Sequence, residues 1–362
     1  MAKKSRKSKD NRGKKYSGIG GQAVLEGIMM KNKEKYSVAV RTPQGDIDVV
    51  VEEYDSFLPI KGISRIPFVR GVFNFIDSLV LGMRTLNYSA SFYEEEQDRH
   101  KKEKILDRIF KDNADKVLSG VTVIFSIAIA IAIFVLLPYF LAQKLGTYVM
   151  SDAMLGIAEG LLRVVIFILY LILISCMKDI RRVFMYHGAE HKCINCIENA
   201  YPLTVENVRK SSRLHKRCGT SFMFYVVFIS VVLFIFINVD DPIMRVVIRL
   251  LLIPVIASLA YEIIRLAGKT DFILVRILSA PGMMLQKLTT REPDDDMIEV
   301  AIAAVEAVFD WKQFFIDKFH YDVDEEARLA DEELSGLKNI KEEDFDADFD
   351  EEDYEDIPGN VQ

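Results

Sequence analysis

Long runs of apolar residues alternate with polar segments through the middle of the chain. A helix needs about 20 mainly apolar residues to cross the hydrocarbon core of a bilayer. Four stretches satisfy this requirement, and they cover residues 117–142, 155–177, 220–239 and 243–264. The pattern therefore predicts a mainly α-helical fold, built on a transmembrane bundle of four spans that has the lipid bilayer as its surroundings.

The segments that flank the spans show other periodicities. Ala23–Met30 is an apolar run, and residues 36–41 and 47–53 are β-rich stretches joined by a turn signal, so a small β unit is expected near the N-terminus. Pro67–Phe92 has a helical period interrupted by polar residues, which predicts an amphipathic helix at the inner membrane surface. A helix buried against the bundle is the alternative. Met297–Phe319 predicts a further amphipathic helix after an acid-rich start.

These elements divide the chain into six expected segments. In order, they are a basic disordered arm (1–17), the small β unit (18–60), an amphipathic helical region (61–116), the four-span membrane domain (117–264) with a cytoplasmic loop at 178–219, a cytoplasmic helical region (265–320) and an acidic disordered tail (321–362).

The two ends of the chain carry opposite charge. Residues 1–16 hold eight Lys or Arg against one Asp, and residues 321–362 hold eighteen Asp or Glu against three Lys or Arg. The basic arm could bind RNA, the ribosome or anionic lipid, and the acidic tail could bind a basic protein partner. Solvated ends without a partner are the alternative for both.

Basic residues also predict the orientation of the spans. Lys and Arg gather before the first span, in residues 178–219 and after the last span, whereas the other two connections hold a single Lys between them. Because basic flanks stay in the cytoplasm, we expect a multi-pass protein of the cell's inner membrane with both termini and the 178–219 loop on the cytoplasmic side.

Candidate metal ligands are concentrated in that loop. The whole chain has five His and four Cys, and three of each lie between residues 187 and 218. His187 and His191 are four residues apart, so a helix places them on one face. Thr204 is a predicted N-cap for a return helix over residues 205–214, which would bring His215 and Cys218 beside the first pair.

His187, His191, His215 and Cys218 are therefore the predicted metal ligands, and their mixed chemistry favours zinc. On a continuous helix the Cys193/Cys196 pair points away from the ligand face, so packing is the favoured interpretation for these thiols; a second site is the alternative.

Glu190 decides what such a site could do. The sequence from His187 to His191 has the His-x-x-Glu-His pattern, in which the glutamate activates water beside a zinc held by the histidines. A catalytic site needs an open coordination position, whereas four protein ligands would close the site and make it structural. The sequence is compatible with both outcomes.

Two further segments attract attention. Residues 17–31 begin glycine-rich without a P-loop lysine, so close backbone packing is the favoured interpretation, although Glu26 could reach a site. Residues 288–296 contain carboxylates that could bind a cation, but capping of a helix start is favoured.

The strings GGQAVLEGIMMK, YHGAEHKCINCIE, HKRCGTSF and LTTREPDDDMIEVAI resemble the YqhQ-like family of bacterial membrane proteins over roughly residues 18–310. That family is a domain of unknown function labelled as a metal-dependent enzyme, so the resemblance implies a metal without naming a substrate. Its members usually carry His-Pro-Arg-Cys where this chain has Lys216 in place of the proline, and they often carry threonine at the position of Cys193.

Two functions follow as hypotheses. The first is a metal-dependent hydrolase with a membrane-proximal zinc site, in which Glu190 acts as the general base. The second is a non-catalytic scaffold or assembly factor, stapled by zinc, that contacts cytoplasmic, translocation or ribosomal machinery.

Overall fold

The computed structural model describes residues 14–54, 56, 66–93, 114–146, 152–236, 239, 241–267, 273–326 and 328. Most of the basic arm and nearly all of the acidic tail lie outside these residues, so their expected partners stay predictions. The chain divides into two compact units, Met1–Phe309 and Asp310–Gln362. All of the helices and strands discussed below belong to the first unit, except α13 (Trp311–Phe319).

The expected β unit is a four-stranded antiparallel sheet in the order β1-β2-β3-β4. Its strands are β1 (Gly20–Val24), β2 (Gly27–Asn32), β3 (Lys35–Arg41) and β4 (Ile47–Glu53). The apolar run Ala23–Met30 is not one strand, because Val24 pairs with Gly27 across a tight turn and Glu26 takes a φ of 49° there. The run therefore contributes the end of β1 and the start of β2.

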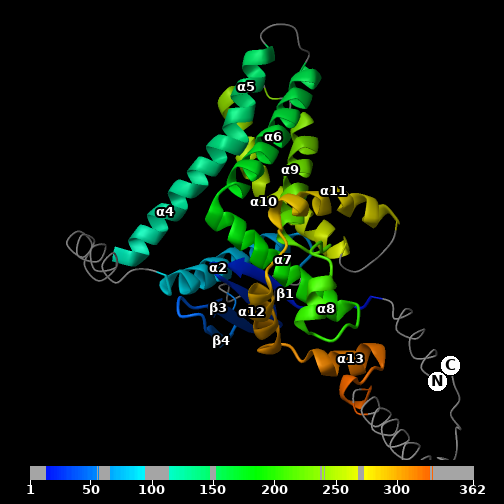
Figure 1. The fold of residues 1–362 in the computed structure, drawn as a ribbon. Helices are drawn as coiled ribbons and strands as arrows, with labels where there is room; N and C mark the ends of the chain where they lie inside the picture. The colour runs from blue at the N-terminus through cyan, green and yellow to red at the C-terminus, as the bar shows by residue number, and fades with distance from the viewer. Residues whose placement is uncertain are drawn as a thin grey trace, which may run out of the picture. The chain divides into compact units, whose positions relative to one another are not determined.

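Alternation along β3 places the sheet between two helices. Tyr36, Val38 and Val40 are buried in a cluster with Leu81 of α2 (Val69–Ser91). Residues on the opposite face meet α12 (Asp295–Glu306), and there the Ser37 hydroxyl donates to the Ala304 carbonyl at 2.6 Å. The period of two in a strand is what divides the side chains between these layers. Figure 1 shows the sheet with α2 and α12 around it.

Among the described residues, three helical stretches are long and apolar enough to cross a membrane: Gly120–Leu145, Met154–Ser175 and Ile243–Leu266. The first combines α4 (Ala114–Ile131), the π-helical turn η2 (Ala132–Leu136) and α5 (Leu137–Gly146); the others lie in α6 (Asp152–Ser175) and α10 (Pro242–Ala267). The expected fourth span forms α9 (Gly219–Ile235), which has 17 residues and packs against α6, α10 and α11 (Ile273–Thr289). A count of four spans is therefore not confirmed.

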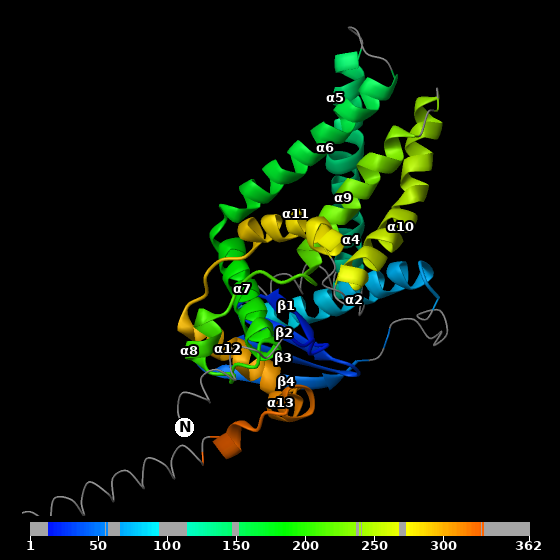
Figure 2. The same ribbon diagram turned by 90° about the vertical axis from the view of Figure 1, so that its right-hand side faces the viewer.

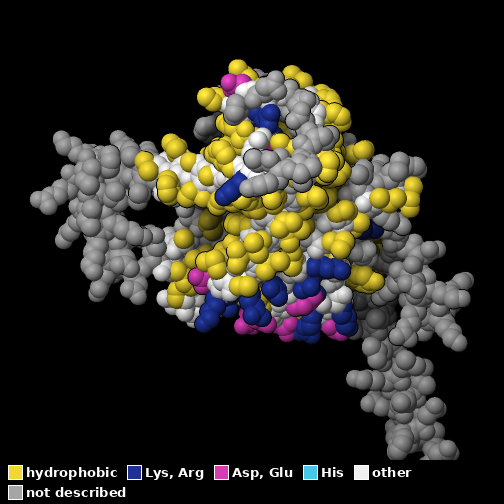
Figure 3. Space-filling model, turned by 90° about the horizontal axis from the view of Figure 1, so that it is seen from above, with side chains coloured by type: hydrophobic (Ala, Val, Ile, Leu, Met, Phe, Trp, Pro, Cys, Tyr) yellow, Lys and Arg dark blue, Asp and Glu magenta, His cyan; other side chains and the backbone are white. Residues whose placement is uncertain are grey.

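The apolar helices and the sheet occupy different ends of the first unit. In Figures 1 and 2, α5, α6, α9 and α10 extend to one end, and the sheet lies at the other with α7 (Lys178–Glu198) and α8 (Val205–Lys210). Figure 3, seen from the helical end, shows mainly hydrophobic side chains among the residues described, with charged side chains gathered along one border. Such a division suits a protein with one part in lipid and one part in water.

Buried charges join two of the apolar helices. The Glu159 carboxylate on α6 accepts from Arg163 on the same helix at 2.8 Å and from Arg249 on α10 at 2.7 Å. Arg163 also donates to the Phe134 carbonyl in η2 at 3.0 Å. All three charged side chains are less than a tenth exposed. Charged side chains buried between apolar helices are costly unless they are paired. The ion cluster therefore fixes how α6, α10 and η2 meet.

Glu159→Gln is expected to destabilise the protein strongly, because it leaves two buried arginines without their carboxylate. Removing one member of a buried ion pair costs about 3–5 kcal/mol, which thermal unfolding in detergent would report as a clear fall in Tm. Glu299→Gln is the matched control, since Glu299 is half exposed and contacts Arg41 at 3.3 Å. An equal fall in Tm for both variants would contradict the assignment.

The expected single helix over Met297–Phe319 is wrong, because the structure has two helices there. The break falls at residues 307–310, between α12 and α13. Asp310 is the N-cap of α13, and its carboxylate accepts from the Gln313 backbone N–H at 2.9 Å. A side chain that caps the second helix competes with continuation of the first.

Candidate metal centre

Helix α7 supplies the first two candidate ligands. It runs without interruption from Lys178 to Glu198, as the interpretation of the His-x-x-Glu-His pattern requires. His187 and His191 consequently share one face, and their ring centroids are 4.4 Å apart. The predicted juxtaposition of the two imidazoles is confirmed.

The return segment differs from the expected helix. Thr204 is the N-cap, and its hydroxyl accepts from the Asn207 backbone N–H at 3.3 Å, as predicted. The helix was expected to reach Leu214, which is wrong: α8 ends at Lys210, and Ser211 is extended. The chain then runs back along α7 as irregular backbone.

Two side chains of α7 hold this irregular segment. Lys192 and Asn195 project from α7 and donate to carbonyl oxygens of the return segment. In a longer α8, the backbone N–H groups of that helix would have donated to these carbonyls instead. Lys192 Nζ contacts the carbonyls of Arg209 and Ser211, both at 2.9 Å, and Asn195 Nδ2 contacts those of Ser212 at 2.7 Å and Leu214 at 3.0 Å. These bonds draw the segment toward the histidines and bring Cys218 to them.

Among the described residues, His187, His191 and Cys218 form a group that could hold a metal ion. Their ligand atoms all lie within 4.8 Å of one another, and His187 Nε2 is 3.2 Å from Cys218 Sγ. The Nδ1 atoms face backbone carbonyls, Thr289 O at 2.9 Å for His187 and Arg213 O at 2.6 Å for His191. A carbonyl only accepts, so each Nδ1 carries the proton and each Nε2 keeps its lone pair for a metal.

Cys218 is held by the start of α9. It is the N-cap of that helix, and its sulfur lies 3.4 Å from the Thr220 backbone N–H and 3.1 Å from the Thr220 hydroxyl. The first turn of α9 therefore fixes the position of the Cys218 sulfur. His187 and His191 lie within α7 and Cys218 is the N-cap of α9, so none of these three candidate ligands depends on a loop tip for its position.

The fourth predicted ligand, His215, has a different neighbour. Its Nε2 lies 3.4 Å from a Glu198 oxygen, and its ring centroid is 5.7 Å from that of His191. Burial lowers the pKa of His215 to about 4. Burial alone would raise the pKa of Glu198, but the bond from His215 and the charges of Arg217 and Lys14 outweigh it and hold that pKa at about 2. The structure therefore brings three of the four predicted ligands into one group.

Glu190 lies beside the group formed by His187, His191 and Cys218, and one of its carboxylate oxygens lacks a hydrogen-bond partner among the described residues. A cavity of about 120 Å³ is lined by Glu190, His187, His191 and Cys218, among other residues. The Gly21 backbone N–H donates to the Glu190 carboxylate, and among the described residues its Oε2 has no hydrogen-bond partner. Burial raises the pKa of Glu190 to about 6, against the opposing effects of His187 and Gly21. The site thus combines three ligand atoms with one unsatisfied carboxylate oxygen.

Gly21 is a site residue that sequence reasoning did not single out. A Cβ there would lie 2.6 Å from the Met29 carbonyl oxygen and 3.1 Å from the Glu190 carboxyl carbon. Only glycine lets β1 approach α7 this closely. The signal was present in the glycine-rich segment, whose favoured interpretation was close backbone packing.

The other residues considered from the sequence lie outside the group. Glu26 pairs with Arg182 and lies 3.3 Å from the Tyr186 hydroxyl. Cys193 and Cys196 are free, buried thiols, which agrees with packing.

Within residues 288–296, Asp295 pairs with Arg209 and Asp294 stands at the N-cap of α12. The contribution of this segment to the site is the Thr289 carbonyl at His187.

Gly188→Ala is expected to weaken metal binding without touching a ligand. A Cβ at Gly188 would lie 2.0 Å from the Arg291 carbonyl oxygen, so the segment that carries the Thr289 carbonyl must shift away from His187. Loss of such a supporting contact typically costs about 10–100-fold in metal affinity, measurable by competition with a chelator. Gly120→Ala, where a Cβ meets nothing within 4 Å, is the control. Unchanged affinity in Gly188→Ala would contradict the role of that carbonyl.

The fold and the site together define a class: a mainly helical protein whose described part has three helices able to cross a membrane and a His–His–Cys group that could hold a metal ion. Residues 66–311 match a family model described as "Protein of unknown function (DUF1385)". The chain is also 35% identical over 289 residues to "Uncharacterized protein YqhQ" of Bacillus subtilis (strain 168), a match that covers 78% of this chain and 89% of the relative. The chain therefore belongs to the DUF1385 family, as its resemblance to YqhQ-like proteins indicated. No solved structure matches it.

Proposed function

We propose that this protein is a membrane-embedded, metal-dependent hydrolase. His187, His191 and Cys218 would hold the ion, and two imidazoles with one thiolate make a donor set that zinc accepts in catalytic sites. The observation that carries the proposal is the buried Glu190 beside these ligands with Oε2 unpartnered. A purely structural site gives no role to such an oxygen.

The proposed mechanism assigns one task to each group. When bound, the metal would polarise the substrate and acidify water. Glu190 Oε2 would accept the proton of the attacking water and return it to the leaving group, as a general base and then a general acid. The Gly21 N–H holds the other side of that carboxylate in place. The Thr289 and Arg213 carbonyls keep both imidazoles in the tautomer that binds metal.

The proposed location is the cytoplasmic face of the inner membrane. The concentration of Lys and Arg in the 178–219 segment supports this location, because basic flanks stay in the cytoplasm. Helix α2 supports an interfacial position for the sheet beside it, because it exposes several large apolar side chains, namely Phe75, Ile76, Leu79, Val80, Met83 and Leu86.

The scaffold alternative requires four protein ligands instead of three. A stapling zinc needs a fourth protein ligand, and His215 is the residue that the sequence offers. Its Nε2 faces Glu198, and Gln286 of α11 fixes the backbone on both sides, accepting from the His215 N–H and donating to its carbonyl, each at 2.8 Å. The geometry therefore favours the open site.

Hydrolysis by purified full-length protein in lipid nanodiscs tests the proposal. We expect the protein stripped with chelator to be inactive on a panel of phosphate and carboxylic esters, and added zinc to restore turnover of at least one class. Zinc bound at full occupancy, with no turnover of any ester in the panel and a third imidazole in the coordination shell, would overturn the proposal in favour of the scaffold.

A further inference from the structure

A second and larger cavity adjoins the metal centre. Its volume is about 380 Å³, and it lies against β1 and α2. Ile19, Gly20 and Gly21 line both this cavity and the smaller one that contains Glu190 and the candidate ligands. The glycine-rich start of β1 therefore lies between this recess and the cavity of the reactive groups.

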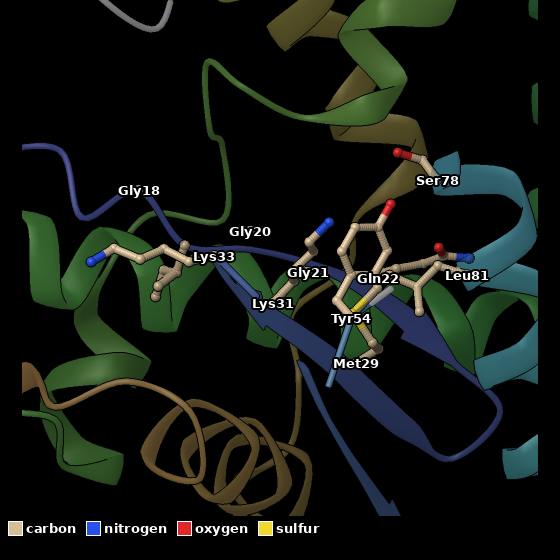
Figure 4. Close-up of a pocket in the computed structure, with 11 residues that line it drawn as sticks. Gly18, Gly20, Gly21, Gln22, Met29, Lys31, Lys33, Tyr54, Ser78 and Leu81 are labelled. Atoms are coloured by element: carbon tan, nitrogen blue, oxygen red, sulfur yellow. The ribbon is translucent and has the colours of Figure 1, made fainter. Parts of the chain in front are cut away.

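The charge that lines the recess is positive. Its charged lining residues are Lys31 and Lys33. Figure 4 shows the Lys31 amino group and the Tyr54 hydroxyl directed toward one region of the recess, while Lys33 points away from it. Lys31 Nζ lies 3.0 Å from the centre of the Tyr54 ring. Burial lowers the pKa of Lys31 to about 8, an effect opposed by the charge of Asp77.

No side chain in the described part of the chain forms a direct ion pair with the partly desolvated Lys31 ammonium, and the charge of Asp77 acts on it without such a contact. A buried cation is stabilised by an anion that enters the same space. Lysine binds phosphate as a point charge, and the amide of Gln22 adds hydrogen-bonding capacity to the same recess. The lining thus fits the oxyanion of a substrate and excludes a cationic one.

Gly20 and Gly21 have different roles in this part of β1. Gly21 packs against Glu190, so its missing side chain is needed by the fold. At Gly20, in contrast, a Cβ would meet nothing within 4 Å, and its backbone is an ordinary strand. Gly20 pairs with Lys31 across the sheet, so a side chain at Gly20 would project from the same face as Lys31 and enter the recess.

We infer that this recess is the substrate pocket of the proposed hydrolase and takes a phosphate ester. The phosphate would lie at Lys31, and the passage from there to Glu190 would run around the edge strand β1, past Gly20. The inference rests on the proposed function, because it needs reactive groups at the far end of the passage. The phosphate could belong to a lipid headgroup or to a soluble ester, and the recognising chemistry is the same for both.

Protection of Lys31 from acylation tests the phosphate site. The full chain in neutral-lipid nanodiscs is treated with trace acetic anhydride at pH 8, where about half of the Lys31 side chains are neutral and reactive, and modification is read by mass spectrometry. Inorganic phosphate is expected to slow acetylation of Lys31 severalfold relative to chloride at equal ionic strength, with exposed Lys35 as the internal control. Equal rates in phosphate and chloride would overturn the inference.

Two further probes separate the sources of phosphate. Protection in nanodiscs that contain phosphatidic acid, compared with phosphatidylcholine alone, would identify a lipid headgroup. Protection by glycerol 3-phosphate in neutral nanodiscs would identify a soluble ester. Either result supports the inference. If neither phosphatidic acid nor glycerol 3-phosphate protects Lys31, the inference is contradicted.

A cobalt-substituted protein tests the passage separately from the metal site. We expect a phosphate ester to change the visible spectrum of the bound cobalt in the parent protein, and Gly20→Val to abolish that change while cobalt stoichiometry and the melting temperature are retained. Cobalt binding with an unchanged spectrum, despite protection of Lys31, would refute the shared pocket but leave the proposed hydrolase standing. Failure to bind cobalt would instead refute the proposed function, while the protection experiment still reports on the phosphate site.

Discussion

Replacing His187 with alanine is expected to reduce zinc affinity by about a hundredfold to a thousandfold, because zinc sites with four ligands bind with about 10–16 kcal/mol and each ligand carries a substantial share. His187 Nε2 lies 3.2 Å from Cys218 Sγ, and the His187 ring is oriented by the Thr289 carbonyl. Its loss leaves one imidazole and one thiolate for the ion. Competition against a chelator of known affinity, followed by metal analysis of the purified protein, measures the effect.

His215→Gln is the matched control for that experiment. It removes a neighbouring imidazole and keeps a side chain that can still donate to Glu198. We expect this variant to retain zinc at nearly parental affinity. Equal losses in the two variants would mean that His215 is a ligand as well, and would contradict a centre with three protein ligands.

Glu190→Gln is expected to keep the metal and to lower turnover by about 10²–10⁴-fold, which is the usual contribution of a general base. Glutamine has the same shape and can still accept from the Gly21 N–H, so the cavity is preserved. It cannot take a proton from water at neutral pH. Metal content and rates of ester hydrolysis are measured on the same preparation.

Glu26→Gln controls for a general loss of negative charge near β1, because Glu26 pairs with Arg182 and is not among the residues that line the metal cavity. We expect its turnover to match that of the parent. Loss of metal in Glu190→Gln would show that Glu190 supports the ligands instead of acting on water. Undiminished turnover in that variant would remove it from the mechanism.

Local rules predicted a large part of the centre. The spacing of His187 and His191 on an unbroken helix follows from 3.6 residues per turn, and Thr204 is an N-cap by its residue type and position. The antiparallel return that brings Cys218 back to the first pair follows from the short connection between the segments. Each of these inferences uses residues that are near in sequence or joined by one turn.

The remaining contacts could not be read from such rules, because they join residues that are distant in the chain. The Thr289 carbonyl that orients His187 is 102 positions away from it. Gly21 approaches Glu190 only because the sheet packs against α7. The irregular backbone before Cys218 depends on Lys192 and Asn195, whose long polar side chains give no local sign that they bind carbonyls.

The length of α9 shows a further limit of reading spans from hydropathy. The apolar run from Thr220 extends to Val239, but the helix ends at Ile235. Hydropathy reports which residues tolerate lipid, whereas hydrogen bonding decides where a helix stops. A protein can therefore carry an apolar segment whose helix is shorter than the run suggests.

X-ray absorption at the zinc edge of the purified, zinc-loaded protein is the most direct test of the metal centre. The structure predicts one sulfur at about 2.3 Å, two imidazoles, and one further light ligand that is not a histidine. A shell of one sulfur and three imidazoles, or a protein that binds no zinc at all, would contradict it.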